Sequence, residues 1–122
     1  MIYGIGTDII EIERIQKSKN SFLQKTFTQQ ELQYFYQKGS HAEILAGMFA
    51  AKEAVAKAIG TGFRGFSPID IEILHDDKQK PFIKISPKLQ SLLEQKKMDT
   101  IFYISISHCK SYAIAFVILN CN

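Results

Sequence analysis

Hydrophobic residues are densest between residues 44 and 59, where they recur at the spacing of an α-helix. Around the helix axis they form a wide apolar stripe that contains Ile44, Leu45, Met48, Phe49, Ala51, Val55, Ala56 and Ile59. The opposite side carries Ala50, Ala54 and Ala58 instead of a polar face. A helix that is apolar or small on nearly every side is usually buried against several other elements. We therefore predict one long, buried central helix.

Local signals mark the ends of the helices. Ser40 and Glu43 have the spacing of a capping box at the start of the central helix, and Gly60 supplies a left-handed residue at its end. Thr28 and Glu31 form a second capping box. This second box predicts a separate helix that precedes the central one.

Alternation of apolar and polar residues predicts β-strands on both sides of the central helix. Residues 2–10 alternate in this way, and Gly4 and Gly6 leave one face of that strand bare. Such a face suits the close approach of another backbone or of a ligand. Residues 69–73 predict a second strand, which returns after a charged turn as a strand over residues 81–85.

The last third of the chain predicts a helix followed by a hairpin. Ser86 and Pro87 begin the helix, and the strands cover residues 100–108 and 112–119. This hairpin is rich in aromatic and β-branched residues on both faces, which suggests helices on one face and another subunit on the other. The predicted fold class is α+β: a single domain over residues 1–122, with an antiparallel-rich sheet packed on the long central helix.

Length and composition narrow the functional classes. A chain of 122 residues can bury one core but not two. The start of the sequence lacks the basic and long apolar regions of a signal peptide, and no segment is suited to span a membrane, so we expect a cytoplasmic protein. Cys109 and Cys121 lack metal-type spacing and are expected to be reduced thiols. The net charge of +3 permits an acidic partner without arguing for nucleic acid.

Three charged residues interrupt the central helix: Lys52, Glu53 and Lys57. Glu53 and Lys57 are four residues apart, and such a pair contributes only about 0.3–0.5 kcal/mol on an exposed helix. Removing either charge from water costs several kcal/mol unless it is fully partnered. Two interpretations remain: ordinary surface ions on a wet helix edge, or a cleft in which a metal ion or phosphates partner these charges.

Two further residues are open to a structural or a functional interpretation. Asp8 lies near the end of the first strand, where it either caps a helix beginning near Glu11 or projects from the bared face as a functional acid. His108 lies at a strand end beside a turn, where a histidine is more often a polar turn residue than a ligand.

A basic segment lies between residues 14 and 30, which contain Arg14, Lys17, Lys19 and Lys25 and no acid. It is either a solvated face or a docking surface for an acidic protein. A nucleic-acid-binding module would need aromatic residues interleaved for base stacking. Only Phe22 and Phe27 occur there, at core-like spacing, so we do not expect a nucleic-acid partner.

Three motifs stand in order along the chain. They are Gly4-Ile5-Gly6-Thr7-Asp8-Ile9; Phe49-Ala50-Ala51-Lys52-Glu53-Ala54 with Lys57 and Gly60-Thr61-Gly62; and Ser105-Ile106-Ser107-His108 with Tyr112-Ala113. With these motifs, essentially the whole chain resembles the holo-acyl-carrier-protein synthases, the small bacterial branch of the 4′-phosphopantetheinyl transferases.

The resemblance implies a magnesium-dependent enzyme that assembles as a homotrimer with active sites at the subunit interfaces. Its substrates would be coenzyme A and apo acyl carrier protein, its product 3′,5′-ADP, and its role fatty acid biosynthesis. Asp8 and Glu53 match the family's catalytic metal ligands, Lys57 a catalytic lysine at the pyrophosphate, and His108 a catalytic histidine near the nucleotide phosphates.

The resemblance also implies residues for the two substrates. Those expected at the coenzyme are Lys57, Gly60, Thr61, Gly62, Lys80, Pro81, Ser107 and His108, and those expected to dock the carrier protein are Arg14, Lys17 and Lys25. Met48 departs from the arginine that many members carry, so that contact is either absent or supplied by Arg64 or Lys52. Gln79 stands at a position where members of the family often have glycine. The alternative enzyme is a magnesium-dependent phosphohydrolase of a nucleotide pyrophosphate, in which water replaces the carrier serine.

Overall fold

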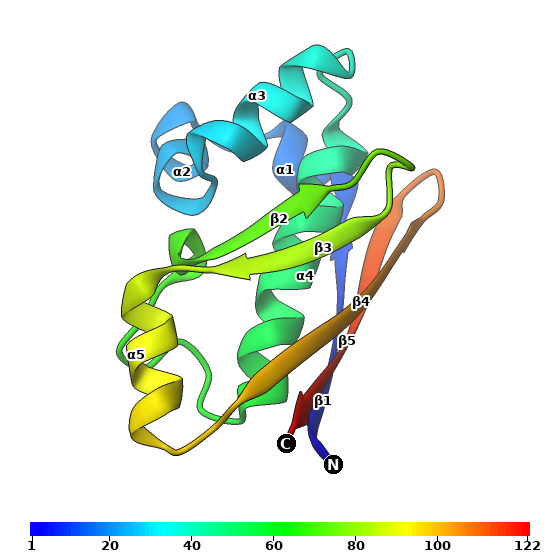
Figure 1. Ribbon diagram of the computed structural model, residues 1–122. Helices are drawn as coiled ribbons and strands as arrows, with labels where there is room; N and C mark the ends of the chain where they lie inside the picture. Colours follow the sequence, from blue (N-terminus) through cyan, green and yellow to red (C-terminus); the bar gives the residue numbers. More distant parts are fainter.

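The computed structural model describes residues 1–122. Figure 1 shows the elements, which are β1 (Ile2–Glu11), α1 (Ile12–Gln16), α2 (Asn20–Thr26), α3 (Gln29–Gln37), α4 (Ala42–Ile59), a 3₁₀ helix (Pro68–Asp70), β2 (Ile71–His75), β3 (Pro81–Ile85), α5 (Pro87–Gln95), β4 (Thr100–His108) and β5 (Tyr112–Cys121). They form two antiparallel sheets, one with the strand order β1-β5-β4 and one made of the β2-β3 hairpin.

Helix α4 is the centre of the fold, as predicted. It lies between the three-stranded sheet and the β2-β3 hairpin (Figure 1), and most of its 18 residues are buried. Its alanines allow these neighbours to pack closely on both sides, and a core of 26 buried residues joins all the layers. The predicted α+β arrangement around a long central helix is therefore confirmed. None of the helices has the length and apolar character needed to cross a membrane.

The bared face of β1 receives the backbone of α4 rather than a ligand. A Cβ atom at Gly4 would lie 2.0 Å from the carbonyl oxygen of Ala58, and one at Gly6 would lie 1.9 Å from that of Ala54. Both distances are far below van der Waals contact, so the two glycines set how closely helix and strand approach. The next residue on this face of β1 is Asp8, which is thereby brought to the edge of α4.

The helix ends agree with the sequence at three places, one of them the Ser86 cap of α5, and disagree at one. Thr28 and Glu31 form the predicted capping box, and Gly60 ends α4 in the left-handed region with a φ of 95°. The box at Ser40 is wrong, because Ser40 has a φ of 59° and its amide donates to the carbonyl oxygen of Phe35 in α3. Ser40 thus ends the preceding helix, and His41 precedes α4 without a side-chain cap.

The second predicted strand begins later than the alternation suggested. Ile69 and Asp70 belong to the 3₁₀ helix, because the Asp70 carboxylate accepts a hydrogen bond from the amide of Ser67 and bends the chain there. The strand itself starts at Ile71 and pairs with β3 as predicted. A capping interaction between a serine and an acid three residues later here outweighs the period-two pattern.

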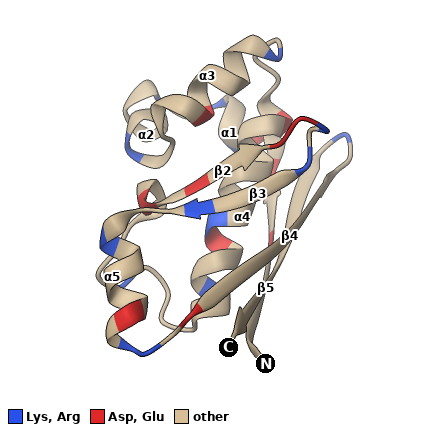
Figure 2. Cartoon of the chain, in the orientation of Figure 1, with Lys and Arg blue, Asp and Glu red and all other residues tan.

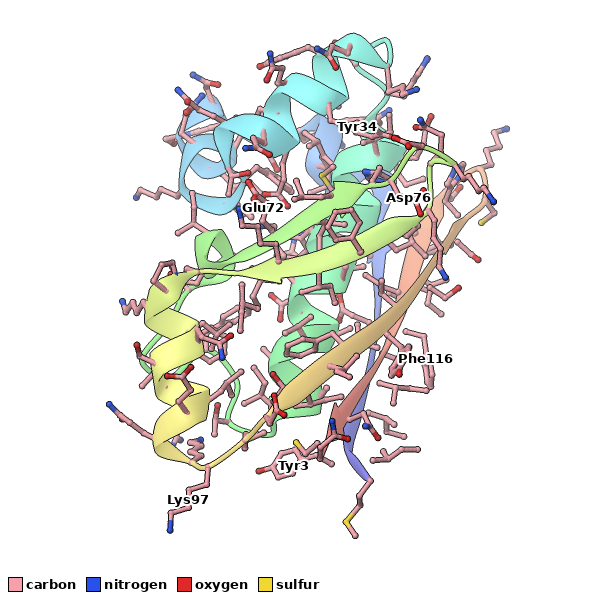
Figure 3. The ribbon with its side chains drawn as sticks, viewed as in Figure 1. Tyr3, Tyr34, Glu72, Asp76, Lys97 and Phe116 are labelled. Carbon is pink, nitrogen blue, oxygen red and sulfur yellow. The ribbon has the colours of Figure 1, made fainter.

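One face of the three-stranded sheet stays uncovered in the single chain. Its exposed apolar side chains are Tyr3, Ile5, Ile9, Ile101, Tyr103, Ile114 and Phe116. In Figure 3, Phe116 lies on the side of the sheet that is turned away from α4. Figure 2 shows that the three strands carry few charged residues. The predicted two-sided apolar sheet is therefore present, with α4 on one face only.

Candidate functional site

Two carboxylates meet where β1 passes the middle of α4. Asp8 comes from the strand and Glu53 from the helix, and both are half-buried. Burial raises the pKa of Glu53, and the charge of Asp8 raises it further, whereas Lys57 and Arg14 act in the opposite direction. The carboxylates are thus close enough to repel one another. Glu53 forms no hydrogen bond or ion pair within the chain, so its half-buried carboxylate is free to bind a ligand.

Lys57 lies beside these acids but contacts the strand. Its ammonium donates hydrogen bonds to Asp8 Oδ1 at 3.1 Å and to the carbonyl oxygen of Thr7 at 2.8 Å. A lysine has three N–H donors, so one is left for an acceptor outside the chain. Asp8 does not cap the following helix, because α1 starts at Ile12 and receives no side-chain cap.

The arrangement fits a magnesium ion. Magnesium prefers carboxylate oxygens, binds through one or two protein carboxylates, and completes its coordination with phosphate oxygens and water. Asp8 and Glu53 provide such a pair on two rigid elements. Burial and, after it, repulsion by Asp8 raise the pKa of Glu53, and a cation between the two acids would offset both. No group of three metal-binding side chains exists in the chain, so a bound ion would keep positions open for a substrate.

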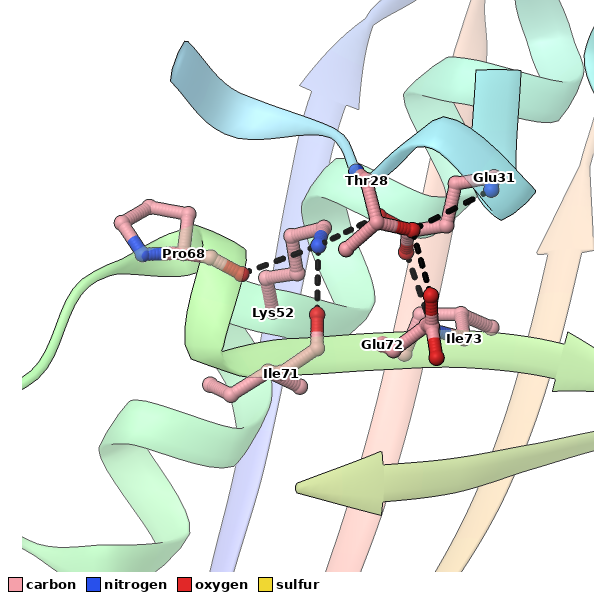
Figure 4. A network of polar contacts seen from close by, with 7 residues as sticks. All are labelled: Thr28, Glu31, Lys52, Pro68, Ile71, Glu72 and Ile73. Carbon is pink, nitrogen blue, oxygen red and sulfur yellow. Dashed lines mark hydrogen bonds and ion pairs between the residues drawn. The ribbon is translucent and has the colours of Figure 1, made fainter. Parts of the chain in front are cut away.

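Lys52 has a different role from its neighbour Glu53. Its side chain is fully buried, and its ammonium donates to Glu31 Oε1 at 2.8 Å and to the carbonyl oxygens of Pro68 and Ile71 (Figure 4). All three N–H groups are therefore used inside the protein. Lys52 is neither a surface ion nor a phosphate ligand, and the suggestion that it replaces an arginine at position 48 is wrong.

The basic segment borders the carboxylate site. The Arg14 guanidinium lies 5.6 Å from the ring centre of Phe49, one turn of α4 before Glu53. Lys17 forms an exposed ion pair with Glu13 at 2.6 Å, and both line an open pocket of about 480 Å³ together with Arg14. Lys25 is exposed on α2 and has no acidic partner. An acidic partner bound along α1 and α2 would thus reach the edge of the carboxylate site.

A second pocket, of about 210 Å³, lies at the start of α4. Among the expected coenzyme residues it contains His108 and Pro81, and its wall also includes Met48. Gln79, from the turn before β3, lines it as well. Arg64 is not part of this pocket, so neither suggested replacement for an arginine at Met48 supplies a charge here.

Two residues of this pocket were missed from the sequence. The rings of Tyr34 in α3 and His75 in β2 stack with centres 4.1 Å apart and planes 2° apart. Burial lowers the pKa of His75, and the charge of Lys38 lowers it further. The Tyr34 hydroxyl donates to Gln79 Oε1 at 2.9 Å. The one available sequence signal was the histidine at the end of a strand, directly opposite Pro81.

The remaining predicted coenzyme residues lie apart from this pocket. Gly60, Thr61 and Gly62 are at the far end of α4, about 20 Å from Gly47 at a rise of roughly 1.5 Å per residue. Ser107 is exposed and points to the opposite face of β4 from His108, because successive strand residues alternate. Lys80 is exposed in the turn before Pro81. One copy of the chain therefore does not gather these groups into a single site.

Relatives of known activity align with nearly the whole length of this chain. A model of the 4′-phosphopantetheinyl transferase superfamily matches residues 4–117. The holo-[acyl-carrier-protein] synthase of Fusobacterium nucleatum is 52% identical over 121 residues, which cover 98% of this chain and 99% of the relative. That of Clostridium beijerinckii is 49% identical over 122 residues and covers 98% of both chains.

Crystal structures of holo-[acyl-carrier-protein] synthases also superpose on this chain. The holo-[acyl-carrier-protein] synthase of Neisseria meningitidis superposes with a TM-score of 0.89 at 41% identity, over 98% of this chain and 99% of that one. The Bacillus anthracis enzyme, solved in complex with CoA (3′,5′-ADP), gives a TM-score of 0.84 at 40% identity, over 100% and 99%. The match extends across the sheets, α4 and both ends of the chain. This protein therefore belongs to the 4′-phosphopantetheinyl transferase superfamily, with the holo-[acyl-carrier-protein] synthases.

Proposed function

We propose that the chain transfers 4′-phosphopantetheine from coenzyme A to a serine of apo acyl carrier protein, in a magnesium-dependent reaction that releases 3′,5′-ADP. Its place would be the cytoplasm, and its role fatty acid biosynthesis. The observation that carries the proposal is the carboxylate pair of Asp8 and Glu53 with Lys57 beside it. Residues 1–122 act in this proposal as one 4′-phosphopantetheinyl transferase domain. The names of the relatives support the same activity.

Asp8, Glu53 and Lys57 have separate roles in the proposed phosphoryl transfer. The serine oxygen forms a bond to the phosphorus that carries pantetheine, and the bond from that phosphorus to the bridging oxygen of the pyrophosphate breaks. Such reactions depend on positioning and on neutralising charge. Asp8 and Glu53 would hold Mg²⁺, which when bound supplies positive charge against the pyrophosphate. Lys57, held in place by Asp8 and the Thr7 carbonyl, directs its remaining N–H at a phosphate oxygen.

The direct test is to incubate the protein with apo acyl carrier protein, coenzyme A and magnesium, and to weigh the carrier. The carrier should gain the mass of one phosphopantetheine group, and omission of magnesium should abolish the gain. The matched control omits the carrier and measures 3′,5′-ADP. Release of 3′,5′-ADP at the same rate without the carrier would favour the phosphohydrolase instead.

We further propose that the active protein is a homotrimer. The exposed apolar face of the three-stranded sheet supports this, because such a surface left open invites aggregation. Gly60 lies at the C-terminal end of α4, whereas His108 lies in the pocket at its start. This separation also fits a site completed by a second copy. Light scattering at micromolar concentration should give three times the 13.9 kDa mass of one chain. A monomer under these conditions would contradict the proposal.

The carrier protein should dock on the basic surface made by Arg14, Lys17 and Lys25. Arg14 also acts on Glu53, so a change there would disturb the metal site, whereas Lys25 is exposed and unpaired. Lys25→Glu should slow association with the carrier several-fold at low salt, and added salt should reduce the difference. Coenzyme A affinity should stay unchanged. Stopped-flow kinetics would measure the rate of association with the carrier and the binding of coenzyme A.

Lys96→Glu is the matched control for this experiment. It makes the same charge reversal at an exposed lysine that follows α5, away from α1 and α2 (Figure 1). If the two variants slowed association equally, net charge and not a docking surface would be responsible.

A further inference from the structure

Arg14 belongs both to the basic surface and to the border of the carboxylate site. It lies on α1, which packs against α4, and it lines the open pocket of about 480 Å³ together with Lys17 and Glu13. Its guanidinium lies 5.6 Å from the ring centre of Phe49 in α4. Residues four apart on a helix share a face, so Phe49 holds Arg14 on the side of α4 that carries Glu53.

The charge of Arg14 is not used inside the chain. Its guanidinium is exposed and forms no hydrogen bond or ion pair, and the adjacent acid Glu13 is paired with Lys17 at 2.6 Å. Phe49 is only 8% exposed and its ring packs against that of Phe22, so the contact with the ring is a fixed one. Arg14 is therefore held beside the carboxylates and stays available to an acidic group of a partner.

The charge of Arg14 also acts on the carboxylate site. Burial and then Asp8 raise the pKa of Glu53, whereas Lys57 and Arg14 lower it. A positive charge that favours an ionised carboxylate repels a metal ion bound to the same carboxylate. The contribution of Lys57 is fixed, because its ammonium is bonded to Asp8 and to the Thr7 carbonyl. The contribution of Arg14 changes with whatever binds to α1.

We propose that Arg14 makes magnesium binding at Asp8 and Glu53 depend on the docking of the carrier protein. In the free protein the Arg14 charge weakens the binding of the ion. An acidic group of the docked carrier neutralises that charge and so strengthens the metal site. The inference rests on the proposed transferase function and adds a coupling between its two binding steps. Coenzyme A without a carrier then meets a weaker metal site, which limits its loss to water.

The test uses Mn²⁺ as the probe of the metal site, because electron paramagnetic resonance measures free Mn²⁺ directly. The carrier has its acceptor serine replaced by alanine, so no transfer occurs, and the Mn²⁺ that it binds by itself is subtracted. Saturating carrier should lower the Kd of wild type for Mn²⁺ about three- to tenfold at low salt, the effect of one unit charge close to a divalent ion. Arg14→Gln should bind Mn²⁺ more tightly than wild type without any carrier, and the carrier should then add little.

Two control variants separate this coupling from docking alone. Arg14→Lys keeps the charge, so it should retain the weaker Mn²⁺ binding of the free protein and most of the response to the carrier. Lys25→Gln removes a charge from the same docking surface but not one that acts on Glu53. It should bind the carrier less tightly and leave the Kd for Mn²⁺ of the free protein unchanged. Because coupling is reciprocal, Mn²⁺ should raise the carrier affinity of wild type by the same factor, which calorimetry would measure.

The outcomes distinguish this inference from the function on which it rests. Equal Mn²⁺ affinity of wild type and Arg14→Gln, or a response to the carrier that is as large in Arg14→Gln as in wild type, would overturn the coupling. A wild-type protein that binds Mn²⁺ and the carrier but gives either result loses only the role of Arg14. A wild-type protein that binds no Mn²⁺, or whose Mn²⁺ binding is unaffected by Glu53→Gln, overturns the metal site of the transferase proposal itself.

Discussion

Glu53→Gln should lower the rate of carrier loading by about 10² to 10³, the usual effect of losing one electrostatic stabiliser of a transition state. The amide has the size of the carboxylate but carries no charge, so it would bind magnesium poorly and leave the pyrophosphate less neutralised. Asp8→Asn should act in the same way. Mass spectrometry of the loaded carrier would measure both rates.

The same change should not harm the fold. Burial and Asp8 raise the pKa of Glu53, so the ionised form is disfavoured in the folded protein. An acid with a raised pKa lowers stability as the pH rises through its titration. Metal-free Glu53→Gln should therefore melt at or above the wild-type temperature at pH 7. The difference should vanish below about pH 4.5, the ordinary pKa of a glutamate, because the acid is then protonated in the folded and unfolded states alike. Magnesium with coenzyme A should raise the melting temperature of wild type more than that of the variant.

Glu94→Gln is the matched control, because Glu94 is an exposed acid on α5 outside the site. It should load the carrier at the wild-type rate. Near wild-type loading by Glu53→Gln would remove Glu53 from the metal site. A Glu53→Gln protein that is inactive but also unstable would show that Glu53 supports the fold instead.

Lys52→Met should destabilise the protein by about 3–5 kcal/mol, because it leaves the Glu31 carboxylate buried without its cation. Glu31 is fully buried and cannot reach water. Its carboxylate accepts hydrogen bonds from the backbone amides of Thr28 and Ile73 (Figure 4). A chain of this size should lose on the order of 10 °C in melting temperature. Urea unfolding would give the change in free energy.

Lys17→Met is the control for this second prediction. It removes the same charge from an exposed ion pair with Glu13, and such pairs contribute about 0–1 kcal/mol. Glu31→Leu in the Lys52→Met background should recover part of the lost stability, since it removes the unpaired charge. If Lys52→Met and Lys17→Met had equal effects, the buried pair would not stabilise the contact of α3 and β2 with α4.

The sequence alone determined the elements that depend on neighbouring residues. The apolar stripe of α4, the left-handed Gly60 and the capping box at Thr28 each depend on residues within a few positions, so the local sequence is enough to predict them. The resemblance carried by the ordered motifs also named Asp8 and Glu53 as a pair. Their glycine-bared strand and alanine-rich helix are visible in the sequence as two faces able to approach closely.

Only the tertiary structure decided what each charge contacts. Lys52 and Glu53 are adjacent in an apolar helix, yet one is bonded to Glu31, 21 residues away, and the other faces Asp8. Ser40 had the spacing of an N-cap but closes the previous helix, because its backbone is left-handed. The stack of Tyr34 on His75 joins a helix to a strand that have no local relation in sequence. Each outcome depends on which distant groups share a low-dielectric interior, and residue spacing contains no record of such contacts.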